Sequence, residues 1–365
     1  MSRNNVLNEK TKREFINYLK EVEGATEATI DSYLRAINRY EEMTDFVDFK
    51  KFNKNSAMMF KGKIRSLKWR GEPISVLTTR TCFIHTSKFF KWLSFQPGYK
   101  NNINTNDINY LKPSNFEELQ ASRPRKKDPP DLQYVISLCN SINDENEIDL
   151  RDKALISFLF LTPIRVDAVI SLPLGCIDEE SLVVSQDPLK NVRTKFSKYI
   201  TSVVFPFDDY LVNNIKVWIK HLKRKGFTDT DPLFPSSKVE FEENIMAFKK
   251  PNRVSNDYWS YSNSVRKLIR KRAKTAGLLY YSPHQFRDGT LKHALSYVED
   301  GIQMKAISQS FGHEHITTSM MNYGNLDEAE LVESIEKMNF KSHPISNNEM
   351  LNELRRMLSD RKKDE

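Results

Sequence analysis

The sequence predicts a mainly α-helical protein with a small β-sheet, an α+β fold, divided into two domains. Apolar residues recur at helical spacing through most of the chain, and only two short runs have the composition of β-strands. The chain has 365 residues, which is more than the ~100–200 residues that one hydrophobic core usually organises. Two domains are therefore the simplest expectation.

The first predicted domain, residues 1–100, has the pattern of a helical bundle. After a helix-start signal at Thr26 and Thr29, apolar side chains return every three or four residues up to Tyr40. A later helix is predicted over residues 77–95. Any one cation on these helices can simply face solvent, but several basic helices in one bundle favour a polyanionic partner. The cations that we expect to contact it are Arg35, Arg39, Arg80 and Lys88.

Residues 101–130 are predicted to form a basic extended linker. An asparagine-rich stretch leads into Ser-Arg-Pro-Arg-Lys-Lys-Asp-Pro-Pro at 122–130, and paired prolines disfavour both helix and strand. The linker cations either follow the same polyanion or only keep the segment soluble. They are Arg123, Arg125, Lys126 and Lys127.

The second predicted domain, residues 131–340, is mostly helical with one strand-rich interruption. Strands are predicted at residues 182–185 and 199–205, joined by a basic turn. The tail, residues 341–365, contains an apolar face at 348–359 that we expect to contact a neighbouring protomer, or alternatively its own domain. The helices predicted before the tail cover residues 132–142, 150–161, 208–225, 256–276, 283–298 and 328–338.

Composition favours a protein that binds a polyanion and argues against a disulfide-rich, membrane-spanning or secreted protein. The formal net charge of +8 favours a polyanionic partner, because neutralising phosphates releases counterions. Three scattered cysteines form neither a disulfide framework nor a paired metal motif. No stretch approaches the ~20 apolar residues of a membrane span, and the N-terminus lacks the apolar core of a secretory signal. We therefore expect a cytoplasmic, nucleoid-associated protein with no membrane contact.

Five residues supply the groups needed to break a phosphodiester without a metal: Arg165, His284, Arg287, His313 and Tyr323. Guanidinium groups can hold non-bridging phosphate oxygens by two-point contacts. Imidazoles can transfer protons near neutral pH, and a phenol can serve as a covalent nucleophile. The competing chemistry would use a metal at His313 and its neighbour His315. No carboxylate cluster or Cys/His tetrad completes such a site, so we expect neither a metal nor a cofactor.

These residues lie in motifs that resemble the signature of the tyrosine recombinases, also called phage-type integrases. The motifs are Thr162-Pro163-Ile164-Arg165, His284-Gln285-Phe286-Arg287, Phe311-Gly312-His313 and Tyr323, which lies ten residues after the last histidine. The resemblance covers nearly the whole chain. It implies that residues 1–100 form a core-binding domain of the helical, SAM-like kind, and that residues 131–340 form the catalytic domain.

The resemblance also implies residue roles. Tyr323 would attack the scissile phosphate and form a 3′-phosphotyrosyl bond, while the two arginines and His313 hold the phosphate and His284 assists proton transfer. The family uses a lysine in the turn between two strands to protonate the departing 5′ oxygen. Here the turn offers Lys190, Lys195 and Lys198, and we choose Lys195 because it lies a few residues before the second strand.

Three departures from the family pattern are visible. Pro163 stands where a glycine is common. The position three after Arg165 is usually acidic but is Ala168 here, and we expect Asp167 to support Arg165 in its place. Tyr323 follows the histidine by ten residues, where many members have nine, which we interpret as a feature of one branch.

The resemblance implies a site-specific recombinase or integrase that acts as a homotetramer on double-stranded DNA with an inverted-repeat core site. It would integrate or excise a mobile element, and an accessory DNA-bending or directionality factor would be a further partner. Three alternatives stay open: a type IB-like topoisomerase, a catalytically silent DNA-binding protein of the same fold, and a basic helical scaffold without DNA chemistry. Exchange of strands between two duplexes distinguishes the recombinase from the topoisomerase.

Overall fold

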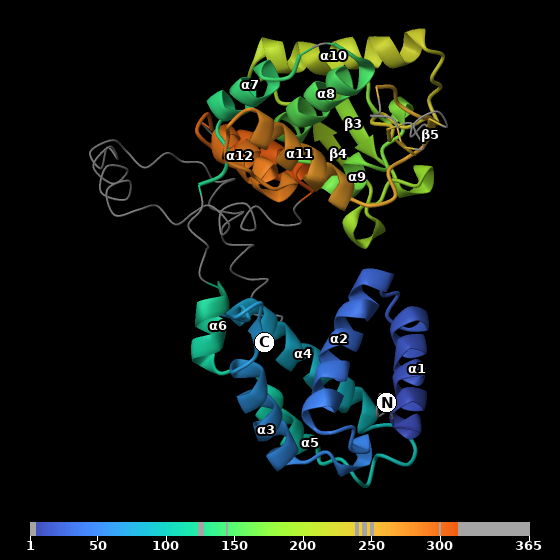
Figure 1. Ribbon diagram of the computed structural model, residues 1–365, viewed down its shortest axis with the longest axis vertical. Helices are drawn as coiled ribbons and strands as arrows, with labels where there is room; N and C mark the ends of the chain where they lie inside the picture. The colour runs from blue at the N-terminus through green and yellow to red at the C-terminus, as the bar shows by residue number, and fades with distance from the viewer. Residues whose placement is uncertain are drawn as a thin grey trace, which may run out of the picture. The chain divides into compact units, whose positions relative to one another are not determined.

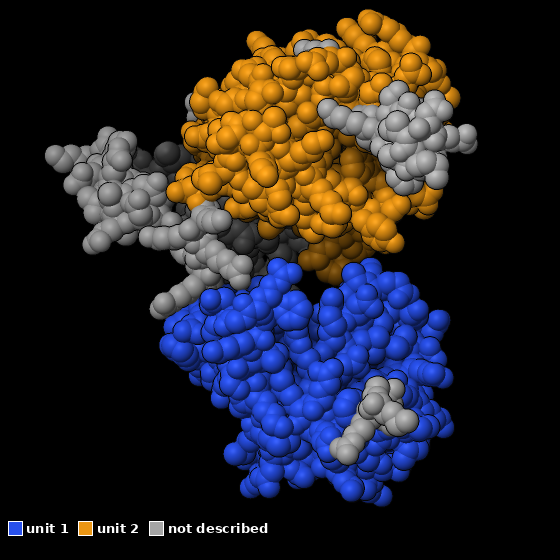
Figure 2. Space-filling model, in the orientation of Figure 1, with its two compact units in different colours: residues 1–125 blue, residues 126–365 orange. Residues whose placement is uncertain are grey.

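The computed structural model describes residues 5–122, 128–143, 145–237, 252–298 and 301–312, together with two short strands within 241–248. Contacts divide the chain into two compact units, residues 1–125 and 126–365, coloured separately in Figure 2. Several predicted features lie outside the described residues. They are His313, Tyr323, Arg123, Arg125, Lys126, Lys127 and the predicted helices at 328–338 and 348–359. No described helix has the length and apolarity needed to cross a membrane.

Unit 1 is a helical bundle (Figure 1), and aromatic side chains make up much of its core. Its elements are α1 (Val6–Glu21), α2 (Glu27–Met43), η1 (Phe49–Lys51), α3 (Lys54–Arg65), β1 (Lys68–Trp69), β2 (Glu72–Pro73), α4 (Val76–Leu93), α5 (Thr105–Ile108), η2 (Asn109–Leu111) and α6 (Asn115–Ser122). The Thr26 hydroxyl caps α2 by accepting from the Thr29 amide, and Ser75 caps α4 in the same way. Phe49, Phe89 and Phe90 meet edge to face in the core. The helices predicted at 26–40 and 77–95 are thus confirmed.

The prediction of an extended linker from residue 101 is wrong for residues 105–122, which form α5, η2 and α6. Local capping explains part of the difference, because Asn104 accepts from the Asn106 amide at the start of α5. Two residues of α6 also pair with earlier residues of unit 1: Glu117 with Nε and Nη2 of Arg65, and Glu118 with Arg80. Burial opposes the charge of Glu117, but the bonds from Arg65 and Ser114 lower its pKa to about 2.

Unit 2 is built around α8, which is buried along nearly its whole length and is covered by α7, α10 and α12 (Figure 1). Its elements are α7 (Leu132–Asn140), α8 (Glu147–Leu161), α9 (Val166–Val169), η3 (Leu174–Cys176), β3 (Val183–Gln186), η4 (Pro188–Lys190), η5 (Lys195–Ser197), β4 (Ile200–Val203), α10 (Asp209–Arg224), β5 (Phe241–Glu242), β6 (Ala247–Phe248), α11 (Asn263–Thr275), α12 (Pro283–Leu295) and α13 (Gly301–Ser310). Strands β3 and β4 pair antiparallel, with Val183 opposite Val203. The predicted mainly helical fold with small sheets is confirmed.

Several details of unit 2 differ from the prediction, and α9, β5 and β6 are among the elements that were not predicted. Helix α11 begins at Asn263 rather than near residue 256, because the preceding segment pairs with the chain that follows α10. Ser236 donates its amide to Asp257 and accepts from the amide of Ser255, and the indole of Trp259 donates to the carbonyl of Phe234. Backbone groups used in this way are not free to form a helix. Helix α13 was not predicted.

Helix α12 packs closely on α8 at Gly289. The Thr290 hydroxyl donates to the carbonyl of Phe160 at 2.7 Å, and a Cβ added at Gly289 would lie 2.3 Å from the carbonyl oxygen of Pro130 and 3.1 Å from the Phe160 ring. We expect Gly289→Ala to lower the free energy of unfolding of unit 2 by about 1–3 kcal/mol, because backbone atoms must move to admit the methyl group.

Denaturant unfolding of the whole chain, followed by circular dichroism, measures the Gly289→Ala effect. Gly62→Ala is the matched control, since Gly62 also lies inside a helix but has no atom within 4 Å of the added Cβ. It should stabilise unit 1 by up to about 1 kcal/mol through helix propensity. A stabilising Gly289→Ala would contradict the packing argument.

Candidate active site

Arg165 lies where α8 gives way to α9. Helix α8 ends at Leu161, and the hydroxyl of the next residue, Thr162, donates back to the carbonyl of Phe158 at 2.7 Å. Arg165 immediately precedes α9 in an extended conformation. Its side chain is half-buried and makes no hydrogen bond or ion pair with another described residue. Burial lowers the pKa of the guanidinium, although arginine stays charged in proteins. A half-buried cation without a counterion is suited to accept an anion.

The expected support of Arg165 by Asp167 is wrong. Asp167 is exposed in the first turn of α9, and no ion pair joins the two residues, both of which the structure describes. The reason is the geometry of the helix start. Arg165 precedes the first turn with extended backbone, while Asp167 lies within that turn and faces solvent.

Helix α12 begins as the sequence predicts, at Pro283. A capping box joins Ser282 and Gln285, whose side chain accepts from the Ser282 amide at 3.0 Å. His284 is in the first turn and its side chain is 80% exposed. Its Nε2 lies 3.9 Å from Oδ1 of Asp288, one turn later. This imidazole is therefore accessible to a ligand.

Arg287, three residues after His284, has a different environment. Only 7% of Arg287 is exposed. Its Nη2 donates to the carbonyl of Phe311 at 2.8 Å, and the guanidinium lies 4.7 Å from the centre of the Phe311 ring. Gly312 follows with φ +63°, and a Cβ there would meet Ile200 of β4 at 2.7 Å. Arg287 thus fixes the backbone immediately before His313.

Hydrogen bonds connect β4 and the residues just after it with the ends of two helices. The amide of Phe205 donates to the carbonyl of Leu161, the last residue of α8, at 2.7 Å. The hydroxyl of Ser202 donates to the carbonyl of Ser310 at 2.6 Å, and the amide of Val203 donates to the Ser310 hydroxyl at 3.1 Å. The segment that leads into His313 is therefore held to β4, and the segment that leads into Arg165 is held to the residues just after β4.

The turn between β3 and β4 carries the three candidate lysines, Lys190, Lys195 and Lys198, all of them exposed. The ammonium of Lys195 lies 4.8 Å from the ring centre of Phe196, and that of Lys198 lies 5.9 Å from it. Phe196 and Ser197 have φ values of 60° and 49°, a region that residues other than glycine rarely adopt. The choice of Lys195 among the three stays a prediction.

Two of the cations expected to contact DNA are paired within unit 1. Arg80 Nε lies 2.5 Å from Glu118 of α6. Lys88 Nζ lies 2.6 Å from Glu23 and 5.4 Å from the ring centre of Tyr33. Burial opposes the charge of Lys88, but the bond to Glu23 raises its pKa. Each of these positive charges is already paired with a carboxylate, which weakens its electrostatic attraction for a polyanion.

The other two cations of this set differ in exposure. Arg39 is half-buried and donates to the sulfur of Cys82 at 3.0 Å. Arg35 is exposed and makes no side-chain hydrogen bond or ion pair within the described residues. It is therefore the most available of the four for contact with DNA.

All three cysteines are buried and free of disulfides. In the part of the chain that the structure describes, no group of three or more His, Cys, Asp or Glu side chains is placed to hold a metal.

Known proteins resemble this chain in sequence and in fold. It is 25% identical over 227 residues to the tyrosine recombinase XerC of Histophilus somni (strain 2336), a match that covers 60% of this chain and 62% of XerC. The chain thus spans about three-fifths of the length of this relative, and 59% of a Haemophilus influenzae XerC.

Two solved structures resemble the fold. A lambda integrase dimer bound to a COC′ core site has a TM-score of 0.58 at 10% identity, with 87% of this chain and 96% of that chain covered. The XerH site-specific recombinase bound to palindromic difH substrate also has a TM-score of 0.58, at 14% identity, with 89% and 84% covered. The model of the phage integrase family matches residues 131–330, more than half of the chain. This chain therefore belongs to the phage integrase family, as its motifs predict.

Proposed function

We propose that this chain is a site-specific DNA recombinase that cuts and rejoins DNA through a 3′-phosphotyrosyl intermediate, without metal, cofactor or ATP. The observation that carries the proposal is the half-buried Arg165, which has no counterion among the described residues. Hydrogen bonds to β4 and to Phe205, just after it, hold the segment leading into His313 and the neighbouring end of α8. A DNA phosphate is an anion that suits such a position.

The proposed reaction balances with groups of this chain alone. The phenol oxygen of Tyr323 attacks phosphorus in line, and a histidine accepts its proton. Arg165, Arg287 and His313 hold the non-bridging oxygens as charge develops. The bond to the 5′ oxygen breaks, and that oxygen takes a proton from Lys195. The 5′ hydroxyl of a partner strand then attacks the phosphotyrosine and restores a phosphodiester, so bond energy is conserved. His284 assists proton transfer from its exposed position on α12.

The proposed partners follow from the family. Residues 1–100 would serve as core-binding domain and residues 131–340 as catalytic domain, joined by the basic segment that ends near residue 130. A lambda integrase tetramer bound to a Holliday junction, with a TM-score of 0.55, supports a homotetramer on two duplexes with inverted-repeat core sites. Residues 348–359 would contact the neighbouring protomer. The reaction would integrate or excise a mobile element on DNA of the nucleoid, in the cytoplasm, with an accessory factor setting direction.

A covalent-adduct assay tests the proposed function. Supercoiled plasmid carrying the DNA that flanks this gene is incubated with the protein in EDTA and quenched with SDS. Protein attached covalently to DNA, together with strand exchange between two duplexes, is the expected result. Relaxation without exchange would identify a topoisomerase instead. Binding without any adduct, also on nicked suicide duplexes, would identify a catalytically silent DNA-binding protein.

DNA binding by unit 1 gives a further prediction. We expect Arg35→Ala to weaken binding to a random-sequence duplex and to reduce the salt slope of log K by about 1, because one phosphate contact is lost. Arg80→Ala removes the same charge, but from a residue paired with Glu118, and should change the slope much less. Fluorescence anisotropy at several salt concentrations measures both. Equal slopes for the two variants would mean that overall charge, rather than contact at Arg35, sets the affinity.

A further inference from the structure

The turn that carries Lys195 cannot hold its shape by local preference alone. Residues 187–199 contain no glycine, yet Asn191, Phe196 and Ser197 have φ values of 62°, 60° and 49°. Side chains other than glycine and asparagine rarely occupy this left-handed region, and such strain persists only where surrounding contacts impose it. The position of Lys195 therefore depends on contacts between the turn and the rest of unit 2.

Arg193, two residues before Lys195, makes three such contacts. Its Nη2 donates to the carbonyl of Trp259 at 3.1 Å, and its Nη1 donates to the carbonyl of Ser260 at 3.2 Å. Its backbone amide donates to the hydroxyl of Ser171 at 2.8 Å. The guanidinium fork matches two successive carbonyls, a two-point contact that a lysine cannot reproduce.

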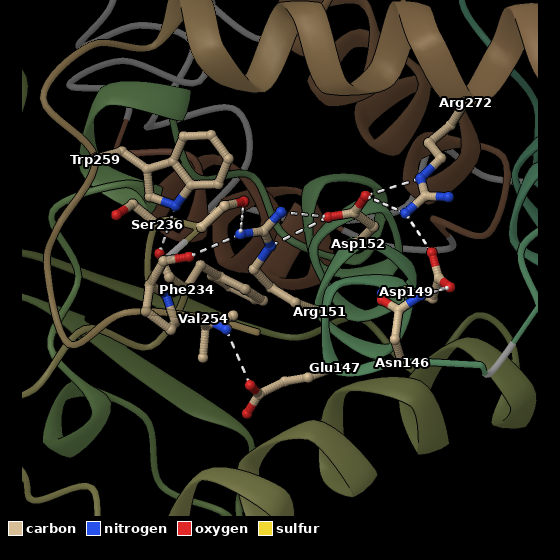
Figure 3. Close-up of polar contacts among 12 residues, drawn as sticks. Asn146, Glu147, Asp149, Arg151, Asp152, Phe234, Ser236, Val254, Trp259 and Arg272 are labelled. Carbon is tan, nitrogen blue, oxygen red and sulfur yellow. Dashed lines mark hydrogen bonds and ion pairs between the residues drawn. The ribbon is translucent and has the colours of Figure 1, made fainter. Parts of the chain in front are cut away.

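Trp259 is itself fixed to the buried interior of unit 2. Its indole nitrogen donates to the carbonyl of Phe234 at 2.7 Å. Its ring faces the guanidinium of Arg151, 4.8 Å from the ring centre (Figure 3). Arg151 is 2% exposed and donates to the carbonyl of Pro235 at 3.1 Å. The Trp259 residue whose carbonyl Arg193 contacts is thus itself held by contacts with the buried interior of unit 2.

Ser171 connects the same turn to α9. Its hydroxyl donates to the carbonyl of Asp167 at 2.9 Å while it accepts the amide of Arg193 at 2.8 Å. Asp167 lies in the first turn of α9, which Arg165 begins. Arg193 therefore links the turn bearing the candidate acid to the helix bearing the candidate phosphate ligand.

We infer that Arg193 is a positioning residue for the proposed reaction. Its guanidinium fixes the Lys195 turn to the carbonyls of Trp259 and Ser260, while its backbone amide holds the turn to Ser171, next to α9. The inference rests on the proposed function, in which Lys195 gives its proton to the departing 5′ oxygen and becomes a neutral amine. Without Arg193 the phosphate is still held, but the proton donor is displaced, and a displacement of about 1 Å can cost ~10²-fold in rate.

Hydrogen exchange read by mass spectrometry tests the contact without DNA. Arg193→Ala should speed exchange of amides in residues 187–199, while α8 keeps wild-type protection. Arg224→Ala is the matched control, because Arg224 is an exposed arginine of α10 with no side-chain hydrogen bond or ion pair in the described residues. Unchanged exchange in Arg193→Ala would overturn the inference, whatever the protein does on DNA.

Cleavage of two duplexes tests the role in proton transfer. They carry the site mapped with the wild type, one with the ordinary 5′ oxygen and one with sulfur in that bridging position. A thiol has a pKa near ~8.5, so sulfur departs without a proton. Arg193→Ala should cleave the oxygen duplex about 10²-fold more slowly and the sulfur duplex at close to the wild-type rate, as Lys195→Ala should. Arg193→Lys should lie between Arg193→Ala and the wild type on the oxygen duplex.

The remaining outcomes separate the inference from the proposed function. Equal slowing of Arg193→Ala on both duplexes would overturn the inference, and would indicate that Arg193 leaves its carbonyls to bind DNA phosphate. Wild-type rates of Arg193→Ala on both would also overturn it. Failure of the wild type to form any adduct in the plasmid assay, which would leave no site to map, would overturn the proposed function. The exchange experiment would still decide whether Arg193 fixes the turn.

Discussion

Tyr323→Phe is expected to abolish the covalent protein–DNA adduct while leaving DNA binding unchanged. Phenylalanine keeps the ring but removes the oxygen that attacks phosphorus, and removal of a catalytic nucleophile typically costs at least ~10⁴-fold in rate. A free phenol has a pKa near ~10. In the proposed reaction the guanidinium groups of Arg165 and Arg287 hold the same phosphate, and they would favour the ionised form of the Tyr323 phenol. Loss of all SDS-resistant adduct, with an unchanged dissociation constant by anisotropy, is the expected pair of results.

Tyr297→Phe provides the matched control for this experiment. Tyr297 is the next tyrosine upstream of Tyr323 and is 67% exposed just after α12, against the ring of His293. Its substitution should leave adduct formation at the wild-type level. An adduct that survives in Tyr323→Phe would mean that another tyrosine attacks the phosphate, and one lost only in Tyr297→Phe would name that residue.

Local signals explain which parts of the fold could be predicted from the sequence. The caps at Thr26 and Ser282, and Pro283 at the first turn of α12, act within a few residues, so the starts of α2 and α12 were found correctly. The linker prediction failed at residues 105–122 because the partners of α6 are distant. Arg80 lies 38 residues before Glu118, and no local sequence pattern predicts an ion pair between residues so far apart.

In the candidate site, too, the sequence predicts which residue types are present but not how buried each one is. Arg165 and Arg287 are equivalent in the sequence, as arginines within motifs. In the structure one is half-buried without a partner among the described residues, and the other is buried against the carbonyl of Phe311. Burial is decided by packing of elements far apart in the chain. The anchoring contacts of Arg193 on Trp259 and Ser260, 66 and 67 residues away, could not be predicted for the same reason.

Asp152→Ala is expected to be the most destabilising of the substitutions considered in unit 2. Asp152 lies in α8 with its side chain 4% exposed. Its Oδ1 accepts from Arg151 Nη2 at 2.7 Å, and its Oδ2 accepts from Arg272 Nη2 at 2.6 Å (Figure 3). Removing the carboxylate leaves the guanidinium of Arg151, which is 2% exposed, without an opposite charge among the described residues. Breaking a buried ion pair in this way costs about 3–5 kcal/mol.

Denaturant unfolding measures the Asp152→Ala effect, with Asp149→Ala as the matched control. Asp149 also pairs with Arg272 at 2.6 Å, but its side chain is 11% exposed and Arg272 would keep Asp152 as its partner. Asp149→Ala should therefore lower the free energy of unfolding clearly less than Asp152→Ala does. Adding Arg151→Met to Asp152→Ala should recover part of the stability, because the cost comes from the unpaired buried cation rather than from lost packing. No recovery, or a cost for Asp152→Ala equal to that of Asp149→Ala, would show that water already reaches Arg151.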